Sequence, residues 1–288
     1  MTIVAPWGVW QCSDQRAAWV VRNQRTGELT VIRTDDSSVK HIQFQCRDGA
    51  ALLAYSGLAK VGTDDISDWL RRLLRGQSRT VDETLIRIRE AADTKLARPA
   101  AALGLEHAFL VGAFLQGRPW AVGIANTPAM GSPPLDHFET SALRPEQTPT
   151  GLAVGGGREA ISDRDWALLR RIVHRRPAKP EDYSRTLARV HRRAKQSGHK
   201  ASKMISEACI TSFMPPSGEG GQTATHWSSG DPFAAKPVPL MASGVDTSEL
   251  HRVAVEALRA IRAGQPLSDE ELQRRTEEAG RRSVEPSP

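Results

Sequence analysis

The first residues of the chain place a hydroxyl group beside an amine that processing would free. If the initiator Met1 is removed, as is usual before a small residue, Thr2 carries both a hydroxyl nucleophile and an α-amine. An α-amine has a reference pKa of about 7.7–8.0, so a useful fraction is neutral near pH 7 and can accept the hydroxyl proton. The sequence therefore predicts Thr2 as a nucleophile.

Three further residues follow Thr2 in an order that suits this chemistry. An Asp-x-Arg triplet begins at Asp14, Lys40 precedes an apolar segment, and Gly57 closes a later one. In this order the chain resembles the proteasome-type N-terminal-nucleophile (Ntn) hydrolases, and in particular the bacterial proteasome β subunits. The resemblance implies Thr2 as the nucleophile, Asp14 and Lys40 as a charged pair beside it, and Gly57 as a backbone donor to the oxyanion.

The resemblance also implies a reaction, the hydrolysis of an amide or peptide bond. The neutral amine of Thr2 would take the hydroxyl proton, and the oxygen would attack a carbonyl of a peptide or small amide substrate. Lys40 would lower the pKa of the amine by like-charge repulsion, and Asp14 would hold the lysine in place. The amide of Gly57 would stabilise the oxyanion.

Other positions depart from the pattern of the family and keep a second function open. Gly156 stands where the family has a serine that positions the nucleophile, and the stretch 197–206 contains no aspartate where the family has one. Ser202 or Ser206 remains a candidate for the serine that the family has in that region. The alternative to a threonine hydrolase is a catalytically inactive, proteasome-like structural or ligand-binding subunit.

The hydrophobic pattern predicts an α+β fold with antiparallel sheets. Short strands extend to Tyr55, and amphipathic helix pairs lie near 63–97 and 162–196, each separated from the next by strands. This order matches the four-layer αββα sandwich of the proteasome-like fold. We expect that domain to cover residues 1–229, followed by a linker at 230–246 and a C-terminal helical tail at 247–288 whose end frays.

Composition narrows the expected partners. The net charge is +6, but acidic and basic residues are interspersed, so we expect no nucleic-acid partner. We interpret the basic run 192–203 as a solvated helix end and loop, and a patch that binds an anionic ligand is the alternative. The N-terminus lacks a signal-peptide pattern and no apolar run reaches the roughly 18 residues of a membrane span, which predicts a cytoplasmic protein. The resemblance implies a homo-oligomer, with Trp69 and Trp166 as large apolar residues on the helices that would pack between subunits.

The cysteines and histidines give no metal-binding pattern along the sequence. The three cysteines, Cys12, Cys46 and Cys209, form no CxxC motif and have no Cys/His ligand spacing. His174, His191 and His199 likewise lack a spacing that is typical of metal ligands. The sequence therefore predicts reduced, buried thiols, no metal and no cofactor.

Overall fold

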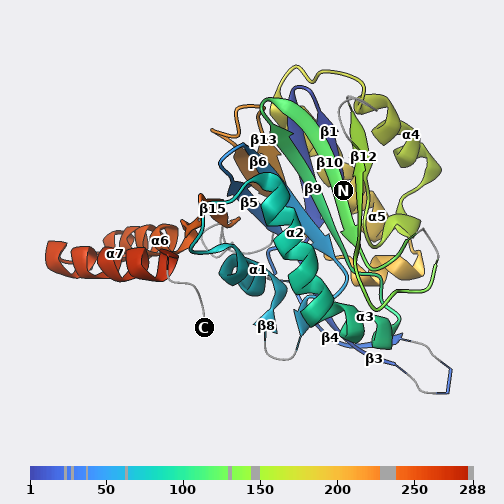
Figure 1. The fold of residues 1–288 in the computed structure, drawn as a ribbon, viewed down its shortest axis with the longest axis horizontal. Helices are drawn as coiled ribbons and strands as arrows, with labels where there is room; N and C mark the ends of the chain where they lie inside the picture. The colour runs from blue at the N-terminus through green and yellow to red at the C-terminus, as the bar shows by residue number, and fades with distance from the viewer. Residues whose placement is uncertain are drawn as a thin grey trace.

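The fold combines two main β-sheets with helices on their outer faces, as the computed structural model shows (Figure 1). The structure describes residues 1–22, 25–26, 29–36, 38–61, 64–128, 132–143, 150–227 and 238–284. The expected α+β class is confirmed. None of the helices within these ranges is both long and apolar enough to cross a lipid bilayer.

The smaller sheet has five strands and contains the N-terminus. All of its neighbouring strands are antiparallel. In spatial order they are β12 (Gly151–Ala153), β1 (Thr2–Ala5), β2 (Gly8–Asp14), β13 (Cys209–Met214) and β14 (Gln222–His226). Since β1 lies between β12 and β2, both of its edges are hydrogen-bonded.

The larger sheet has seven strands. They pair antiparallel except β15 with β5, which is parallel. In spatial order they are β11 (Glu139–Leu143), β10 (Arg118–Ala125), β9 (Ala108–Leu115), β6 (Gly49–Ser56), β5 (His41–Gln45), β15 (Leu240–Ala242) and β16 (Val245–Asp246). Two separate two-stranded ribbons are formed by β3 (Ala17–Arg22) with β4 (Leu29–Asp35) and by β7 (Lys60–Val61) with β8 (Asp64–Asp65).

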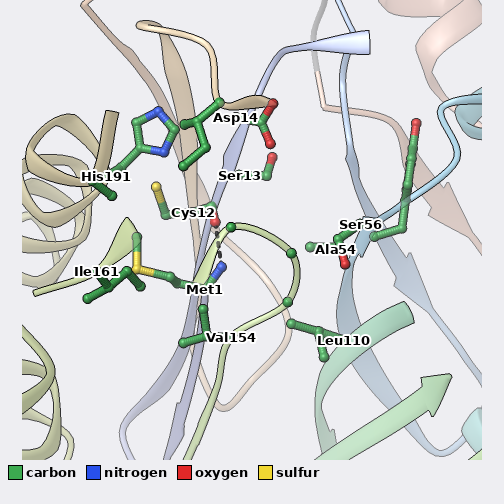
Figure 2. A pocket seen from close by; sticks show the side chains of 16 residues that line it. Met1, Cys12, Ser13, Asp14, Ala54, Ser56, Leu110, Val154, Ile161 and His191 are labelled. Carbon is green, nitrogen blue, oxygen red and sulfur yellow. Dashed lines mark hydrogen bonds between the residues drawn. The ribbon is translucent and has the colours of Figure 1, made fainter. Parts of the chain in front are cut away.

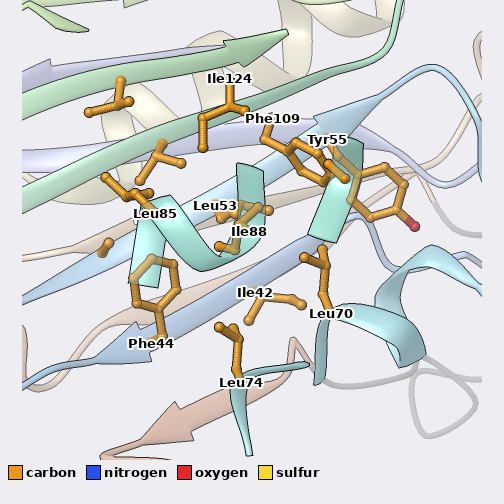
Figure 3. Packing of buried hydrophobic residues seen from close by; sticks show 14 of the residues in the cluster. Ile42, Phe44, Leu53, Tyr55, Leu70, Leu74, Leu85, Ile88, Phe109 and Ile124 are labelled. Atoms are coloured by element: carbon orange, nitrogen blue, oxygen red, sulfur yellow. The ribbon is translucent and has the colours of Figure 1, made fainter. Parts of the chain in front are cut away.

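The first helix pair covers the outer face of the larger sheet. It consists of α1 (Ile66–Leu74) and α2 (Val81–Ala92), continued by a π-helical turn (Asp93–Ala97) and α3 (Arg98–Leu103). A capping box between Thr80 and Glu83 starts α2 and satisfies two amides that the helix leaves open. Apolar residues of α1 and α2, such as Leu70 and Ile88, pack with Phe109 of β9 in one buried cluster (Figure 3). The helices therefore present the apolar face that the spacing predicted.

The second helix pair packs against the smaller sheet. It consists of α4 (Asp163–Ile172) and α5 (Pro180–Gln196), and the side chain of Ser162 caps the start of α4. Trp10 of β2 lies at the centre of this contact, with ring centroids 4.9 Å from Tyr183 and 4.8 Å from Phe213. Buried residues of β1, including Ile3, complete the cluster.

The two sheets also contact each other directly. A third buried cluster joins Val4 and Val9 of the smaller sheet to Leu52 and Phe114 of the larger sheet. Gly112 of β9 allows the close approach, because a Cβ atom at this position would lie 2.5 Å from Cγ1 of Val9. Apolar clusters thus fill the space on both faces of the smaller sheet.

The C-terminal segment differs in part from the expected linker and tail. Residues 240–246 form β15 and β16 at the edge of the larger sheet, while 228–237 lie outside the described residues. The short strand Leu240–Ala242 has too few residues to show a period, which explains why the sequence indicated only a linker. Two helices, α6 (Ser248–Arg262) and α7 (Asp269–Val284), follow and project from the sheets (Figure 1). The domain boundaries remain a prediction.

One of the two tryptophans expected at a subunit contact is part of the chain's own core. Trp69 is 7% exposed and its ring lies 6.4 Å from that of Phe109. Trp166 is partly buried and packs against the α4–α5 cluster, with the guanidinium of Arg170 over its ring. Self-association therefore remains a prediction, which light scattering tests.

A buried carboxylate joins the C-terminal segment to α1. Asp246 is fully buried, and its Oδ2 accepts hydrogen bonds from Arg71 at 2.9 Å and Arg75 at 2.7 Å. Burial by itself raises the pKa of Asp246, but hydrogen bonds from Ser248 and Arg75 and the charges of both arginines hold the pKa below its ordinary value of 3.8. This carboxylate therefore stabilises the fold while it is ionised.

We predict that Asp246→Asn lowers the free energy of unfolding by about 3 kcal/mol, because two arginines lose the charge that compensates them. Asp68→Asn is the control: its carboxylate binds the same Arg71 but is 56% exposed, so we expect a loss below about 1 kcal/mol. The contribution of Asp246 is present above pH 3.8 and is lost as the pH falls through the lower pKa of the folded state. Urea unfolding of both variants measures the difference, and equal losses would contradict this account.

Candidate functional site

A small cavity lies at the N-terminus, where the ends of several strands meet α5. Its volume is about 70 Å³, and its lining includes Met1, Ser13, Asp14, Ser56 and His191. Figure 2 shows Met1 at the centre of this group, with Asp14 and Ser13 on one side and Ser56 on another. Strands of both sheets and α5 therefore contribute to one site.

Met1 extends the pairing of β1 with β2 by one residue. Its α-amine donates to the carbonyl of Cys12 at 2.7 Å, and the amide of Cys12 donates to the carbonyl of Met1 at 2.8 Å. Burial lowers the pKa of this α-amine from its ordinary value of 8.0. The amine at the cavity is thus that of Met1, and burial makes it easier to deprotonate than an exposed α-amine.

Thr2, the expected nucleophile, has its side chain on the opposite face of β1. The residue is 2% exposed, and its Oγ1 accepts a hydrogen bond from Nε2 of Gln11 at 3.2 Å. The same nitrogen lies 3.0 Å from the carbonyl oxygen of Leu52 and 2.8 Å from that of Leu110, both in the larger sheet. The hydroxyl therefore points between the two sheets, into a separate cavity of about 350 Å³ with largely apolar walls.

Asp14 and Lys40 form the ion pair that the resemblance implied. Nζ of Lys40 lies 3.0 and 3.1 Å from the two carboxylate oxygens of Asp14. The side chain of Lys40 is 8% exposed and that of Asp14 23% exposed, so the pair is largely desolvated. Asp14 also accepts from the amide of Arg16, which fixes the carboxylate at the end of β2. The structure thus brings two of the four predicted residues together.

Gly57 follows β6 beside the cavity, but the lining residue is its neighbour Ser56. The backbone of Gly57 has φ of +105°, and a Cβ atom there would lie 2.5 Å from the carbonyl oxygen of Glu106. Both the conformation and the close approach require glycine. This structural requirement explains the residue independently of an oxyanion role.

The glycine triplet 155–157 lies at the cavity. A Cβ atom on Gly155 would come within 2.5 Å of Oγ of Ser56, so the triplet lets backbone pack directly on that hydroxyl. Among the described residues, Oγ of Ser56 and Oγ of Ser13 are buried and have no hydrogen-bond partner. Buried hydroxyls normally have partners, so these two are candidates for contact with a bound molecule.

Cys12, Cys209 and His191 form a cluster that the sequence analysis missed. Cys12 is 2% exposed, Cys209 is fully buried and His191 is 6% exposed. A hydrogen bond with Cys12, together with burial, raises the pKa of the Cys209 thiol, and burial lowers the pKa of His191. The three residues are far apart in the sequence, so no local spacing could have revealed the cluster.

Comparisons with known proteins identify no family. No family model matches the chain, and no curated protein matches it. Among solved structures, Anbu (ancestral β-subunit) from Yersinia bercovieri aligns with a TM-score of 0.42 at 13% identity, over 93% of this chain and 99% of that chain. The Anbu Gly-1 mutant from Hyphomicrobium sp. strain MC1 aligns with a TM-score of 0.41 at 12% identity, over 93% of this chain and all of the other.

These comparisons correct the family assignment made from the sequence. The resemblance implied membership of the Ntn hydrolases close to the bacterial proteasome β subunits. The structures reported above are Anbu proteins instead, and no family model supports the original assignment. The short motifs around Thr2, Asp14 and Lys40 contain too few residues to define a family.

We predict that Asp14→Ala lowers the free energy of unfolding by about 3 kcal/mol, because it leaves the ammonium of Lys40 without its counter-charge in a largely dry site. Adding Lys40→Met should recover part of the loss, with a coupling energy of about 1–3 kcal/mol in a double-mutant cycle. Asp36→Ala serves as the control, since the carboxylate of Asp36 pairs with Arg16 but is 42% exposed. Additive effects of the two site mutations would contradict the account.

Proposed function

We propose that this chain is a non-hydrolytic, proteasome-like subunit that binds a small polar ligand in the cavity at Met1, and that Thr2 is a structural residue. The observation that carries the proposal is the position of the Thr2 hydroxyl. It lies between the sheets against Gln11, whereas Met1 and Asp14, the partner of Lys40, line the cavity. The Thr2 hydroxyl and the polar groups of the cavity are thus on different sides of β1.

Pairing on both edges of β1 makes this separation difficult to reverse. Thr2 pairs with Ala153 on one side and with Gln11 on the other. Successive side chains of a strand point to opposite faces, so the hydroxyl can reach the cavity only if the strand shifts its register by one residue. Such a shift would also turn Val4 out of the cluster between the sheets and bring Ile3 into it.

The polar groups at the cavity support binding of a small ligand. Ser13 and Ser56 offer hydroxyls without partners among the described residues, and Met1 offers an amine whose pKa is lowered. A volume of about 70 Å³ admits a few water-sized groups rather than a peptide. The ligand class that fits is therefore a small molecule or ion with hydrogen-bonding groups.

The proposal includes the four-layer αββα arrangement. Its support is the set of three apolar clusters, which lie between α1, α2 and the larger sheet, between the two sheets, and between the smaller sheet and α4, α5. Each helix layer then buries one face and each sheet buries both faces against neighbouring layers, as layered domains require.

A second candidate function is threonine hydrolysis after removal of Met1. The Asp14–Lys40 ion pair favours it, because such a pair can set the pKa of a nearby amine. The α-amine of Thr2 would then take the proton of the Thr2 hydroxyl, and the hydroxyl oxygen would attack an amide carbonyl. The backbone amide of Gly57 would stabilise the oxyanion. This route requires the hydroxyl of Thr2 to leave Gln11 and turn toward Lys40.

Covalent labelling separates the two functions. We predict that a β-lactone or a peptide boronate forms no adduct at Thr2, so that the reagent adds the same mass, or none, to wild type and to Thr2→Val. Thr2→Val should instead lower the free energy of unfolding by about 1 kcal/mol, because the buried hydrogen bond to Gln11 is lost. An adduct that disappears in Thr2→Val and is suppressed in Lys40→Ala would establish the hydrolase and refute the proposal.

A further inference from the structure

The cluster of Cys12, Cys209 and His191 has the composition of a metal site. Its ligand atoms, the two sulfurs and a ring nitrogen, all lie within 4.8 Å of one another. Tetrahedral zinc with Zn–S bonds of about 2.3 Å and Zn–N bonds of about 2.0–2.1 Å needs ligand atoms about 3.5–3.8 Å apart. The longest of these separations must therefore shorten by about 1 Å when the three residues bind one ion.

The three residues come from rigid, packed elements. Cys12 of β2 is paired with Thr211, and Cys209 lies two residues from Thr211 on β13, so the two thiols are diagonal neighbours on one face of the sheet. His191 lies on α5, which covers this face. Ligands on strands and helices are held more precisely than ligands on loops.

The hydrogen bond of His191 selects the tautomer that a metal needs. Its Nε2 lies 3.0 Å from the carbonyl oxygen of Ser206, and since a carbonyl only accepts, Nε2 carries the proton. Nδ1 of a neutral ring is then a free electron-pair donor. Ser206 itself is fixed, because its hydroxyl accepts from the amide of Gln15 at 2.8 Å and donates to the carbonyl of Ala208 at 2.5 Å. This support resembles the outer shell that orients histidine ligands of zinc.

We propose that Cys12, Cys209 and His191 bind one Zn²⁺ ion, with the fourth coordination position facing the cavity at Met1. Two thiolates balance the charge of the ion, which suits a site surrounded by apolar residues such as Ile205. Cys12 and His191 line the cavity, so a water molecule or a small ligand can complete the tetrahedron from that side. The proposal goes beyond ligand binding in general and holds whether or not Thr2 reacts.

The test uses the full-length chain, stripped with a chelator and kept reduced. We expect it to take up one Zn²⁺ per chain, and Co²⁺ in its place should show thiolate charge-transfer absorption and the strong visible bands of tetrahedral coordination. Cys12→Ser, Cys209→Ser and His191→Gln should each weaken binding by more than about 100-fold, since loss of an outer-shell partner alone costs 10–100-fold.

Cys46→Ser is the matched control. Cys46 is the third cysteine and lies near Thr84, at the start of α2, in a different cluster. This variant should bind zinc as the wild type does, and zinc should raise the melting temperature of both. X-ray absorption at the zinc edge of the wild type, with two sulfur ligands and one nitrogen ligand expected, needs no variant to fold. Failure of the reduced wild type to bind zinc or cobalt at micromolar concentration would overturn the proposal, as would unchanged binding in folded Cys12→Ser and Cys209→Ser.

Discussion

The double pairing of β1 is the constraint on which the N-terminal site depends. Hydrogen bonds to β12 and β2 fix its register, and the register decides which side chains meet the helices and which meet the other sheet. Ile3 and Ala5 join the cluster with α4 and α5, while Val4 joins the cluster between the sheets. Thr2 is on the same face as Val4, so the position of its hydroxyl follows from the burial of its neighbours.

Gln11 connects this strand arrangement to the larger sheet. Its amide nitrogen contacts the Thr2 hydroxyl and the carbonyl oxygens of Leu52 and Leu110 in the interface between the two sheets. Buried polar groups are costly without partners, so the amide and the hydroxyl stabilise each other's position. The same register places Cys12 on the opposite face of β2, toward His191 and Cys209. Because side chains alternate between the two faces of β1 and β2, the Thr2 hydroxyl lies on the face away from the cavity. The same alternation places Cys12 on the face where Cys209 and His191 lie.

The sequence predicted those parts of the fold that depend on local pattern. The helix pairs followed from apolar residues such as Leu70 and Ile88 at helical spacing, and caps such as Thr80 marked their starts. The partnership of Asp14 and Lys40 followed from a resemblance, and the structure shows them as an ion pair while their chemical role remains a proposal. Local pattern was sufficient for the helix pairs because each helix carries its own periodicity.

Other features depend on pairing between distant segments, which no local pattern contains. Alternation in β1 defines two faces but does not say which face meets the helices, so the sequence could not place the hydroxyl of Thr2. The cluster of Cys12, Cys209 and His191 joins β2, β13 and α5, and its members become neighbours only when these elements pack. The strand Leu240–Ala242 was interpreted as part of a linker because its stability comes from pairing with β5.

A crystal structure of the purified chain tests the central claim most directly, through the position of the Thr2 side chain. The account predicts that Oγ1 of Thr2 lies within hydrogen-bond distance of Nε2 of Gln11, between the two sheets, with Asp14 and Lys40 paired to each other at the cavity. A chain that begins at Thr2, with its hydroxyl turned to Nζ of Lys40, would contradict it.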